Sequence, residues 1–187
     1  MDVQPLIDQL TALVPGVELA PAPAADTDVT PALWVSAPHI QAVCRALRDT
    51  PGLEYVAFSN VTAVDHHPRR TPRFDLVYHV VSPHRRARLR LKVQVADQQP
   101  VASVTPVWEG AGWCEREVYD LFGIVFDDHA DLRRIMMTDD WEGHPLRKDY
   151  PVQVRKDAQT YMPLQVTAEE FRANMERDRR SRVRSEQ

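Results

Sequence analysis

The stretch RFDLVYHVVSPHRRARLRLKVQV, residues 73–95, decides the fold class. Over residues 87–95 apolar side chains alternate with basic or polar ones, which is the two-residue period of a strand with one buried and one solvated face. A looser alternation covers residues 73–81, and residues 82–85 suit a short hairpin connection. The sequence therefore predicts two antiparallel strands that share an apolar face.

Elements on either side of this hairpin complete the fold prediction. A run of β-branched and aromatic residues at 55–64 predicts a third strand, and residues 33–35 predict a short one. Apolar residues at helical spacing predict one helix near residues 6–14 and another that opens at Ser36 and ends before Pro51. Because strands joined by hairpins pair antiparallel, we expect an α+β fold. It would be a two-layer sandwich of a mostly antiparallel sheet with helices on one face.

Length and composition bound the class of protein. The 187 residues, 43% of them hydrophobic, suit one domain or one domain with an extended arm. A formal net charge of -4 gives no overall attraction to nucleic acid or anionic lipid. Cys44 and Cys114 are too few for an iron–sulfur cluster, which takes about four thiolates. Without a signal-peptide pattern or an apolar run of ~18 residues, the chain is expected to meet a membrane only through a partner.

The most charged part of the chain is residues 113–151, WCEREVYDLFGIVFDDHADLRRIMMTDDWEGHPLRKDYP, here called the ionic segment. Near its start Cys114, Val118 and Leu121 repeat at i, i+4 and i+7, and Gly123 stands where a left-handed C-cap belongs. The spacing predicts a short amphipathic helix with this apolar stripe. Its other face is expected to be charged and to carry Glu115, Arg116, Glu117 and Asp120.

Three blocks of the ionic segment follow one another: EREVYDLFGIVF, then DLRRI after His129, and finally GHPLRKDYP. Together they closely resemble the signature of the C subunit of the respiratory NADH:quinone oxidoreductase, bacterial complex I. Three ordered blocks are far more specific than one short motif. The chain departs from that signature at residues 128–131, where Asp-His-Ala-Asp replaces Gly or Asn followed by His-Pro-Asp.

The resemblance implies a structural subunit in the peripheral arm of the complex, on the cytoplasmic side of the cell membrane. Flavin mononucleotide, the iron–sulfur clusters and the quinone would be held by partner subunits and not by this chain. The chief partner would be the D subunit, which helps to form the quinone site, with iron–sulfur subunits nearby. The resemblance also implies an α+β domain at 1–112, a partner-contact segment at 113–151 and an extended C-terminal arm at 152–187.

The ionic segment supplies the candidate site residues, and none of them is expected to be catalytic or to bind a metal or cofactor. Arginine, histidine and aromatic residues beside carboxylates are typical of interface hot spots. The partner-contact candidates are Glu115, Arg116, Glu117, Tyr119, Asp120, Phe122, His129, Asp131, Arg133, Arg134, His144, Arg147, Lys148 and Asp149. In an equally weighted interpretation, Arg116 pairs with Asp120 and Asp131 with nearby arginines, which locks the loop onto its own domain. The two interpretations are compatible.

Three other functions are considered. The same module could be the equivalent subunit of a membrane-bound hydrogenase or of a related quinone- or ferredoxin-linked complex. A stand-alone metal-dependent hydrolase would need ligands from the acidic loop, namely Asp127, Asp128, His129, Asp131 and His144. The basic strand face at 86–92 and the tail at 177–184 could contact nucleic acid, but no aromatic residues are interleaved with the basic ones and the chain is acidic. We expect no nucleic-acid partner.

Overall fold

The computed structural model describes residues 3–22, 30–151, 169 and 172–173. The chain divides into two units, residues 1–151 and 152–187, and the fold described below is that of the first. Its elements follow the order α1 (Gln4–Leu13), β1 (Leu19–Pro21), β2 (Ala32–Val35), the 3-10 helix η1 (Ala37–His39), α2 (Ile40–Asp49), β3 (Ala57–Asp65), β4 (Phe74–Ser82), β5 (Ala87–Val95), β6 (Val101–Ala102), α3 (Ala111–Phe122) and β7 (Phe126–Asp127). The arm expected at 152–187 lies outside the described residues except at 169 and 172–173.

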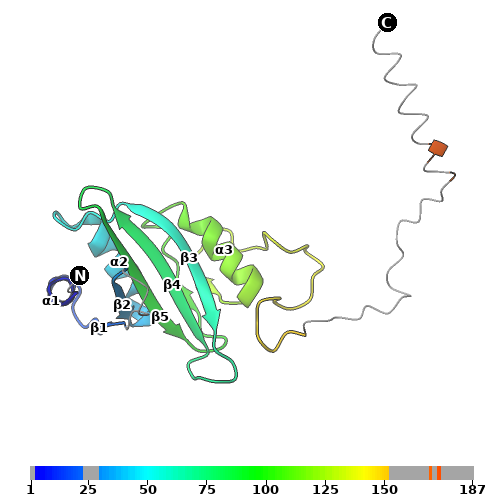
Figure 1. Cartoon of the computed structure of the whole chain (residues 1–187), viewed down its shortest axis with the longest axis horizontal. Helices are drawn as coiled ribbons and strands as arrows, with labels where there is room; N and C mark the ends of the chain where they lie inside the picture. The colour runs from blue at the N-terminus through cyan, green and yellow to red at the C-terminus, as the bar shows by residue number, and fades with distance from the viewer. Residues whose placement is uncertain (1–2, 23–29, 152–168, 170–171, 174–187) are drawn as a thin grey trace, which may run out of the picture. The chain divides into compact units, whose positions relative to one another are not determined.

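Five strands form one sheet in the order β1-β2-β5-β4-β3 (Figure 1). Strands β3, β4 and β5 make the expected antiparallel meander. Strand β2 pairs with β5 in parallel, with Leu33 opposite Leu91, and β1 pairs antiparallel with β2. The predicted α+β fold with a mostly antiparallel sheet is confirmed. The sequence did not predict the parallel pair of β2 and β5. Hairpin spacing indicates pairing only between successive strands, whereas α2, β3 and β4 lie between β2 and β5 in the chain.

The sheet buries one face, as the alternation over residues 87–95 predicts. Tyr78 of β4 lies opposite Leu91 of β5, and both side chains are fully buried. Val43 of α2 and Val118 of α3 belong to the same buried cluster as these two residues. Helices α2 and α3 therefore form the second layer over the apolar face, which confirms the two-layer arrangement.

The opposite face of the sheet is solvated along β5, whereas Asp75 and Val77 of β4 are buried on that face. Arg88 and Gln94 of β5 are exposed on it, and the ammonium group of Lys92 lies 5.5 Å from the ring of Trp34 on neighbouring β2. The long stems of these side chains cover the sheet while their polar ends reach water. The alternating basic residues of β5 thus have a structural explanation as the wet side of a half-buried strand.

Replacing Leu91 by alanine tests the packing of the sheet. Leu91 is fully buried on the middle strand, so we expect the free energy of unfolding to fall by about 2 to 5 kcal/mol. The matched control is Leu13→Ala at a side chain that is 44% exposed, which should change it by less than about 1 kcal/mol. Urea denaturation followed by tryptophan fluorescence measures both, and equal losses would contradict the assigned core.

Candidate functional site

Helix α3 opens the ionic segment and organises the rest of it. It ends at Gly123, which has the left-handed φ of 76° and donates its N–H to the carbonyl of Tyr119 at 2.8 Å, so the predicted C-cap is confirmed. The predicted apolar stripe of Cys114, Val118 and Leu121 packs on the core, but the prediction is wrong for two residues of the charged face. Glu115 and Asp120 are fully buried, whereas Cys114 and Leu121 are only partly buried. Two carboxylates thus lie inside the protein, where each needs hydrogen-bond partners.

Glu115 ties the chain before α3 to the helix. Its carboxylate accepts hydrogen bonds from the hydroxyl of Ser103 at 2.6 Å and from the N–H of Val104 at 2.8 Å. The ring nitrogen Nε2 of His129 lies 3.8 Å from the same carboxylate. Burial raises the pKa of Glu115, and these hydrogen bonds offset part of the rise. Glu115 and His129 are therefore bonded within the domain, and a partner contact by either residue stays a prediction.

Asp120 is the anchor of the loop that follows the helix. Its Oδ2 accepts hydrogen bonds from the successive N–H groups of residues 135–137, at 3.0, 2.7 and 2.8 Å. Its Oδ1 lies 2.6 Å from the guanidinium of Arg134. Burial alone would raise the pKa of Asp120, but the hydrogen bonds from these N–H groups and from Arg134 lower it overall. The carboxylate thus fixes four consecutive residues of the loop onto α3.

The predicted pair between Arg116 and Asp120 does not form. Arg116 instead donates to the backbone carbonyls of Arg133 and Arg134, both at 3.1 Å, while Arg134 takes the place beside Asp120. Asp131 pairs with Arg133 at 3.0 Å, as the intramolecular interpretation expected. The broader expectation, that ion pairs lock the loop onto its own domain, therefore holds with a different arginine.

Two glycines of the ionic segment leave room for aromatic rings. The Nδ1 of His144 lies 2.9 Å from the carbonyl oxygen of Asp120, which places its ring against Gly123, where a Cβ atom would come within 2.5 Å of Cδ2. Gly143 has a φ of 77°, and a Cβ there would lie 2.9 Å from the ring of Tyr150. Glycine is needed at both positions for conformation and for space.

Asp65 at the end of β3 forms a second anchor. Its buried carboxylate accepts hydrogen bonds from Arg73, at 3.0 and 2.8 Å, and from the N–H of Lys148 at 2.8 Å. Arg73 also donates to Asp149 at 2.6 and 3.0 Å. Burial alone would raise the pKa of Asp65, but the bonds from Arg73 and from backbone N–H groups lower it overall. This anchor fixes the end of the ionic segment to the sheet.

Sequence reasoning missed Asp65, Arg73 and Asp97, which pairs with both Arg73 and Arg147. A signal for Asp65 was present, since it continues the buried positions Val61 and Ala63 at a spacing of two. A carboxylate at a buried position of the strand is expected to have a buried hydrogen-bond or ion-pair partner.

The guanidinium groups of both arginines of this anchor also lie over the ring of Phe74, with centroid distances of 5.0 Å for Arg73 and 5.4 Å for Arg147.

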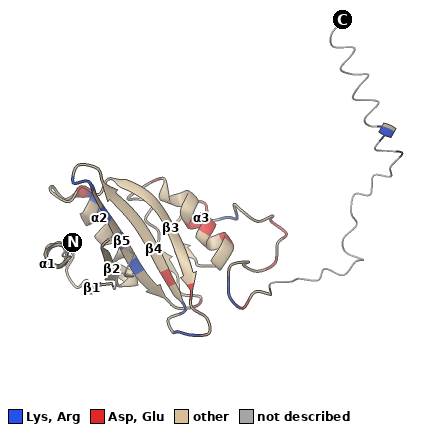
Figure 2. Ribbon diagram, in the orientation of Figure 1, with Lys and Arg blue, Asp and Glu red and all other residues tan. Residues whose placement is uncertain are grey.

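The remaining candidates divide into inward and outward residues. Phe122 packs edge-on against Phe74, with ring centroids 6.5 Å apart, and Tyr119 lies edge-on to His144 at 6.1 Å. Both contacts are within the domain. The outward candidates are Glu117, Asp131, Arg133, Lys148 and Asp149, all of them exposed. Acidic and basic residues mark the loop after α3 along its length (Figure 2).

Exposed apolar side chains belong to both α3 and the loop that Arg116 holds. Trp113 is 64% exposed and Met136 is 63% exposed, and Ile135 is exposed next to Met136. The guanidinium of Arg116 lies 5.1 Å from the ring centroid of Trp113 while it holds the backbone of residues 133–134. Arg116 thus connects the helix side of the patch to the loop side. We call Trp113, Arg116, Ile135 and Met136 the Trp113 patch.

The carboxylates and imidazoles of the acidic loop do not converge in the described structure. Among the described residues no three His, Cys, Asp or Glu side chains gather closely enough to hold an ion. Asp127 and Asp128 are exposed, His129 lies against the carbonyl of Gly112, and His144 against that of Asp120. The ligand set that a metal-dependent hydrolase would need is therefore not assembled among the described residues. Glu117 and Asp120, although three residues apart on α3, do not share a site, because Glu117 is exposed while the Asp120 carboxylate is bonded to the loop.

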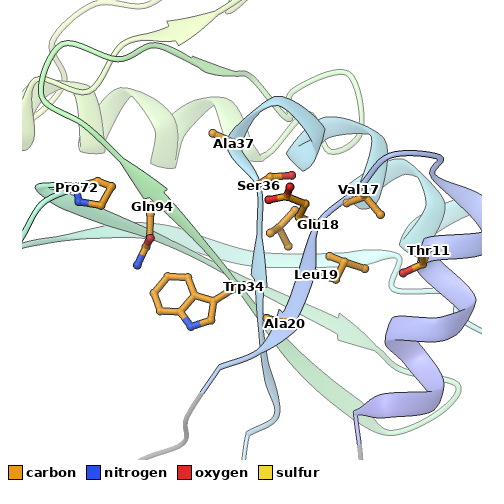
Figure 3. Close-up of a pocket in the computed structure, with 11 residues that line it drawn as sticks. Thr11, Val17, Glu18, Leu19, Ala20, Trp34, Ser36, Ala37, Pro72 and Gln94 are labelled. Atoms are coloured by element: carbon orange, nitrogen blue, oxygen red, sulfur yellow. The ribbon is translucent and has the colours of Figure 1, made fainter.

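A hollow of about 740 Å³ lies elsewhere, beside α1 and the β1–β2 end of the sheet (Figure 3). Trp34 and Gln94 form one side of it and Thr11 and Val17 the other, and Glu18 is its single charged lining residue. None of the lining residues belongs to the ionic segment. The hollow is therefore separate from the ionic segment. In the part of the chain that the structure describes, no helix has the length and apolar character needed to span a membrane.

Comparison with known proteins finds one family. Residues 33–156 match the family model described as the respiratory-chain NADH dehydrogenase, 30 Kd subunit. The C subunit of the NADH-quinone oxidoreductase of Geobacter sulfurreducens is 52% identical over 112 residues, which cover 59% of this chain and 68% of that protein. The corresponding C subunit of Sinorhizobium medicae is 43% identical over 148 residues, 75% of this chain and 73% of that one.

Two solved structures have a similar fold. A trypsin-resistant fragment of Nqo5 has a TM-score of 0.53 at 26% identity, covering 71% of this chain and all of the fragment. A chain of the membrane-bound sulfane sulfur reductase, an archaeal respiratory membrane complex, has a TM-score of 0.64 at 21% identity and covers 88% of this chain and 94% of that one. At that identity the second likeness concerns the fold alone.

Replacing Gly123 by alanine tests the packing of His144 on the helix end. The left-handed φ and the close approach of the ring should lower the free energy of unfolding by about 1 to 3 kcal/mol. The matched control is Gly110→Ala, where φ is -63° and no atom lies within 4 Å of the added Cβ, so a change below about 0.5 kcal/mol is expected. In a His144→Ala background only the conformational part of the loss should remain. An unchanged loss there would sink the steric explanation.

Replacing Asp120 by asparagine tests the loop anchor. The change leaves the largely buried Arg134 without its counter-charge and should lower the free energy of unfolding by about 3 to 5 kcal/mol. The control Asp131→Asn removes an exposed pair with Arg133 and should cost at most about 1 kcal/mol. Chemical denaturation measures both, and limited proteolysis reports whether the loop has come loose.

The contribution of Asp120 to the free energy of unfolding should fall as the pH is lowered. Because folding lowers the pKa of Asp120, its contribution to stability is fully present above the unfolded value of about 3.9 and is lost as pH falls through the lower folded pKa. The difference in stability between the wild type and Asp120→Asn should therefore be constant from about pH 5 upwards and shrink below about pH 4. A difference that grows on acidification would mean that the carboxylate is not stabilised in its charged form.

Proposed function

Since the chain belongs to the family of the respiratory-chain NADH dehydrogenase 30 kDa subunit, we propose that it is a non-catalytic structural subunit of a proton-translocating NADH:quinone oxidoreductase. In this role the chain holds neighbouring subunits in place within the peripheral arm of the complex. The ionic segment is its docking element. The supporting observation is that residues 123–150 form almost no regular structure and are nonetheless held by two buried carboxylates.

A loop fixed in this way presents a preorganised surface. Residues 134–137 are held through Asp120, and residues 148–149 through the anchor of Asp65 and Arg73, so little conformational entropy remains to be lost when a partner binds. The polar anchors leave apolar side chains facing outward instead of into the core. Interfaces of large assemblies combine such fixed backbones with exposed apolar anchors.

The exposed apolar side chains point to the same segment. Five of the eight large hydrophobic residues that are exposed in the described structure belong to it, namely Trp113, Val125, Ile135, Met136 and Leu146. A concentration of exposed apolar side chains marks a contact surface. Tryptophan and arginine, which meet in the Trp113 patch, are the residue types most enriched at interface hot spots. The patch is therefore assigned as the centre of the docking surface.

The partner in this proposal is chiefly the D subunit, with neighbouring iron–sulfur subunits around it. Flavin mononucleotide, the iron–sulfur clusters and the quinone belong to these partners. The buried Cys44, whose pKa is raised mainly by burial, and the single half-buried Cys114 do not amount to a cluster site. The complex would hold the chain on the cytoplasmic side of the cell membrane, with membrane contact made only by its partners.

The second candidate is the equivalent subunit of a sister complex with another electron donor. A chain of the archaeal sulfane sulfur reductase has the same fold, which is what this candidate rests on. The identities of 52% and 43% to C subunits of NADH-quinone oxidoreductases favour the NADH-linked complex. The two candidates differ in the activity of the assembled complex.

Purification from native cells tests the proposal. The tagged chain, extracted from membranes in mild detergent, should bring down a large complex that contains iron and flavin and oxidises NADH with quinone. The same complex with activity towards hydrogen or another donor would move the chain to the second candidate. A chain recovered alone would contradict both.

Replacing both Trp113 and Met136 by alanine should reduce the recovered complex by about tenfold or more, since truncating interface hot spots typically costs about 2 kcal/mol or more of binding free energy. The free energy of unfolding of the isolated chain should stay within about 1 kcal/mol of the wild type because both side chains are exposed. Leu13→Ala, at an exposed apolar residue of α1, is the matched control and should leave recovery unchanged. Wild-type recovery of the double variant would remove the Trp113 patch from the interface.

A further inference from the structure

Strand β3 lies at one edge of the five-stranded sheet. It pairs with β4 on one side, and in the described part of the chain no strand pairs with its other side. In an antiparallel pair the N–H and C=O groups of alternate residues face the neighbouring strand, and those of the residues between face away. The outer edge of β3 therefore carries a row of backbone donors and acceptors that the sheet itself does not use.

The sequence of β3 does not protect this edge. Edge strands usually carry lysine, proline or short length against further pairing, and the nine residues AFSNVTAVD contain neither lysine, arginine nor proline. A register shift between Phe58 and Asn60 interrupts the edge near its start, but β3 pairs regularly with β4 from Asn60 to Asp65, and Val64 in that part is exposed. The opposite edge differs, because β1 has three residues and ends in Pro21. An unprotected edge of this length is expected to be covered in the working protein.

A pocket lies between this edge and helix α3. It has a volume of about 110 Å³ and is lined by residues 60–62 of β3, by one side of α3 that includes Glu117 and Leu121, and by Leu146 of the ionic segment. Successive strand residues point to opposite faces of the sheet, so what residues 60–62 present together is their backbone edge. A strand edge facing a helix across a groove is the arrangement by which proteins bind an extended peptide as an added strand.

We propose that this edge pocket binds an extended segment of a partner subunit, which joins the sheet beside β3. The inference rests on the proposed function, since it requires that the chain work in a complex. The volume of about 110 Å³ exceeds the ~30 Å³ of a water molecule and suits one aliphatic side chain. The exposed carboxylate of Glu117 at the pocket selects a lysine or arginine in the same segment.

A second copy of this chain is a poorer occupant of the edge. Pairing two β3 strands around a two-fold axis would bring the two Glu117 carboxylates to the same interface, and like charges in such pairs destabilise it. A partner segment with a basic residue has the complementary charge. The backbone of the added strand would supply binding free energy, and the apolar and basic side chains would supply specificity.

Photo-cross-linking in the intact complex tests the inference. A photoreactive amino acid replaces Thr62 in the tagged chain in native cells, and the control position is Arg88, which is exposed on the solvated face of β5. We expect Thr62 to cross-link to another subunit, at an extended segment that contains an aliphatic and a basic residue. Arg88 should not label that segment. Dimers of this chain, cross-links within it, or no product in an assembled complex would each overturn the inference.

Charge reversal at the pocket supplies a second test. Glu117→Lys should lower the recovery of the complex by about tenfold, and Glu117→Gln by less. Glu109→Lys, at another exposed glutamate outside the pocket, is the matched control and should leave recovery unchanged. Equal effects of Glu117→Lys and Glu109→Lys would refute the role of the pocket.

Hydrogen exchange separates the failure of this inference from that of the proposed function. Alternate amides of β3 should exchange at least about tenfold more slowly in the complex than in the isolated chain, and the amides bonded to β4 should be slow in both. A complex that contains iron and flavin but leaves the outer amides of β3 unprotected would sink the inference and leave the proposed function standing. A chain that never joins a complex would end both.

Discussion

The burial of the Asp120 carboxylate is the constraint on which the ionic segment depends. A carboxylate without solvent is stable only when hydrogen bonds and an opposite charge surround it. Here one short stretch supplies all of them, the three N–H groups of residues 135–137 and the guanidinium of Arg134. The backbone of that stretch must therefore take a single conformation for α3 to pack at all. Loop and helix are in this sense one cooperative unit.

Residues further along the ionic segment are also held in place through Asp120. Arg134, held by that carboxylate, also donates to the carbonyl of Gly143 at 3.0 Å, and the ring of His144 then lies on Gly123 at the end of α3. The far end of the segment is closed by Asp65 and Arg73. Between the two anchors the segment is held by charge-assisted hydrogen bonds more than by apolar burial. This is why Trp113 and Met136 can stay outside without loss of order.

The sequence predicts the parts of this structure that depend on periodicity. The alternation at 87–95 determines which face of β5 is buried, and Gly123 marks the end of α3, because both follow from the geometry of a single element. Periodicity failed for Glu115 and Asp120, since it treats a carboxylate as a solvated residue. Their partners are largely backbone N–H groups, which no pattern of residue types reveals. The bond between Asp65 and the N–H of Lys148 joins positions 83 residues apart, beyond any local pattern.

Helix α3 connects the two surfaces assigned to partners. One side of it packs on the sheet through Val118, Trp113 carries the docking patch, and Glu117 and Leu121 line the edge pocket. The N–H of Leu146, which closes that pocket, donates to the carbonyl of Leu121 at 3.0 Å, so the pocket exists only while the loop is in place. The backbone that carries Met136 in the patch is held by Asp120 directly. The Trp113 patch and the edge pocket therefore both depend on the buried carboxylate of Asp120. A partner that contacts both surfaces would bind only a chain whose ionic segment has folded.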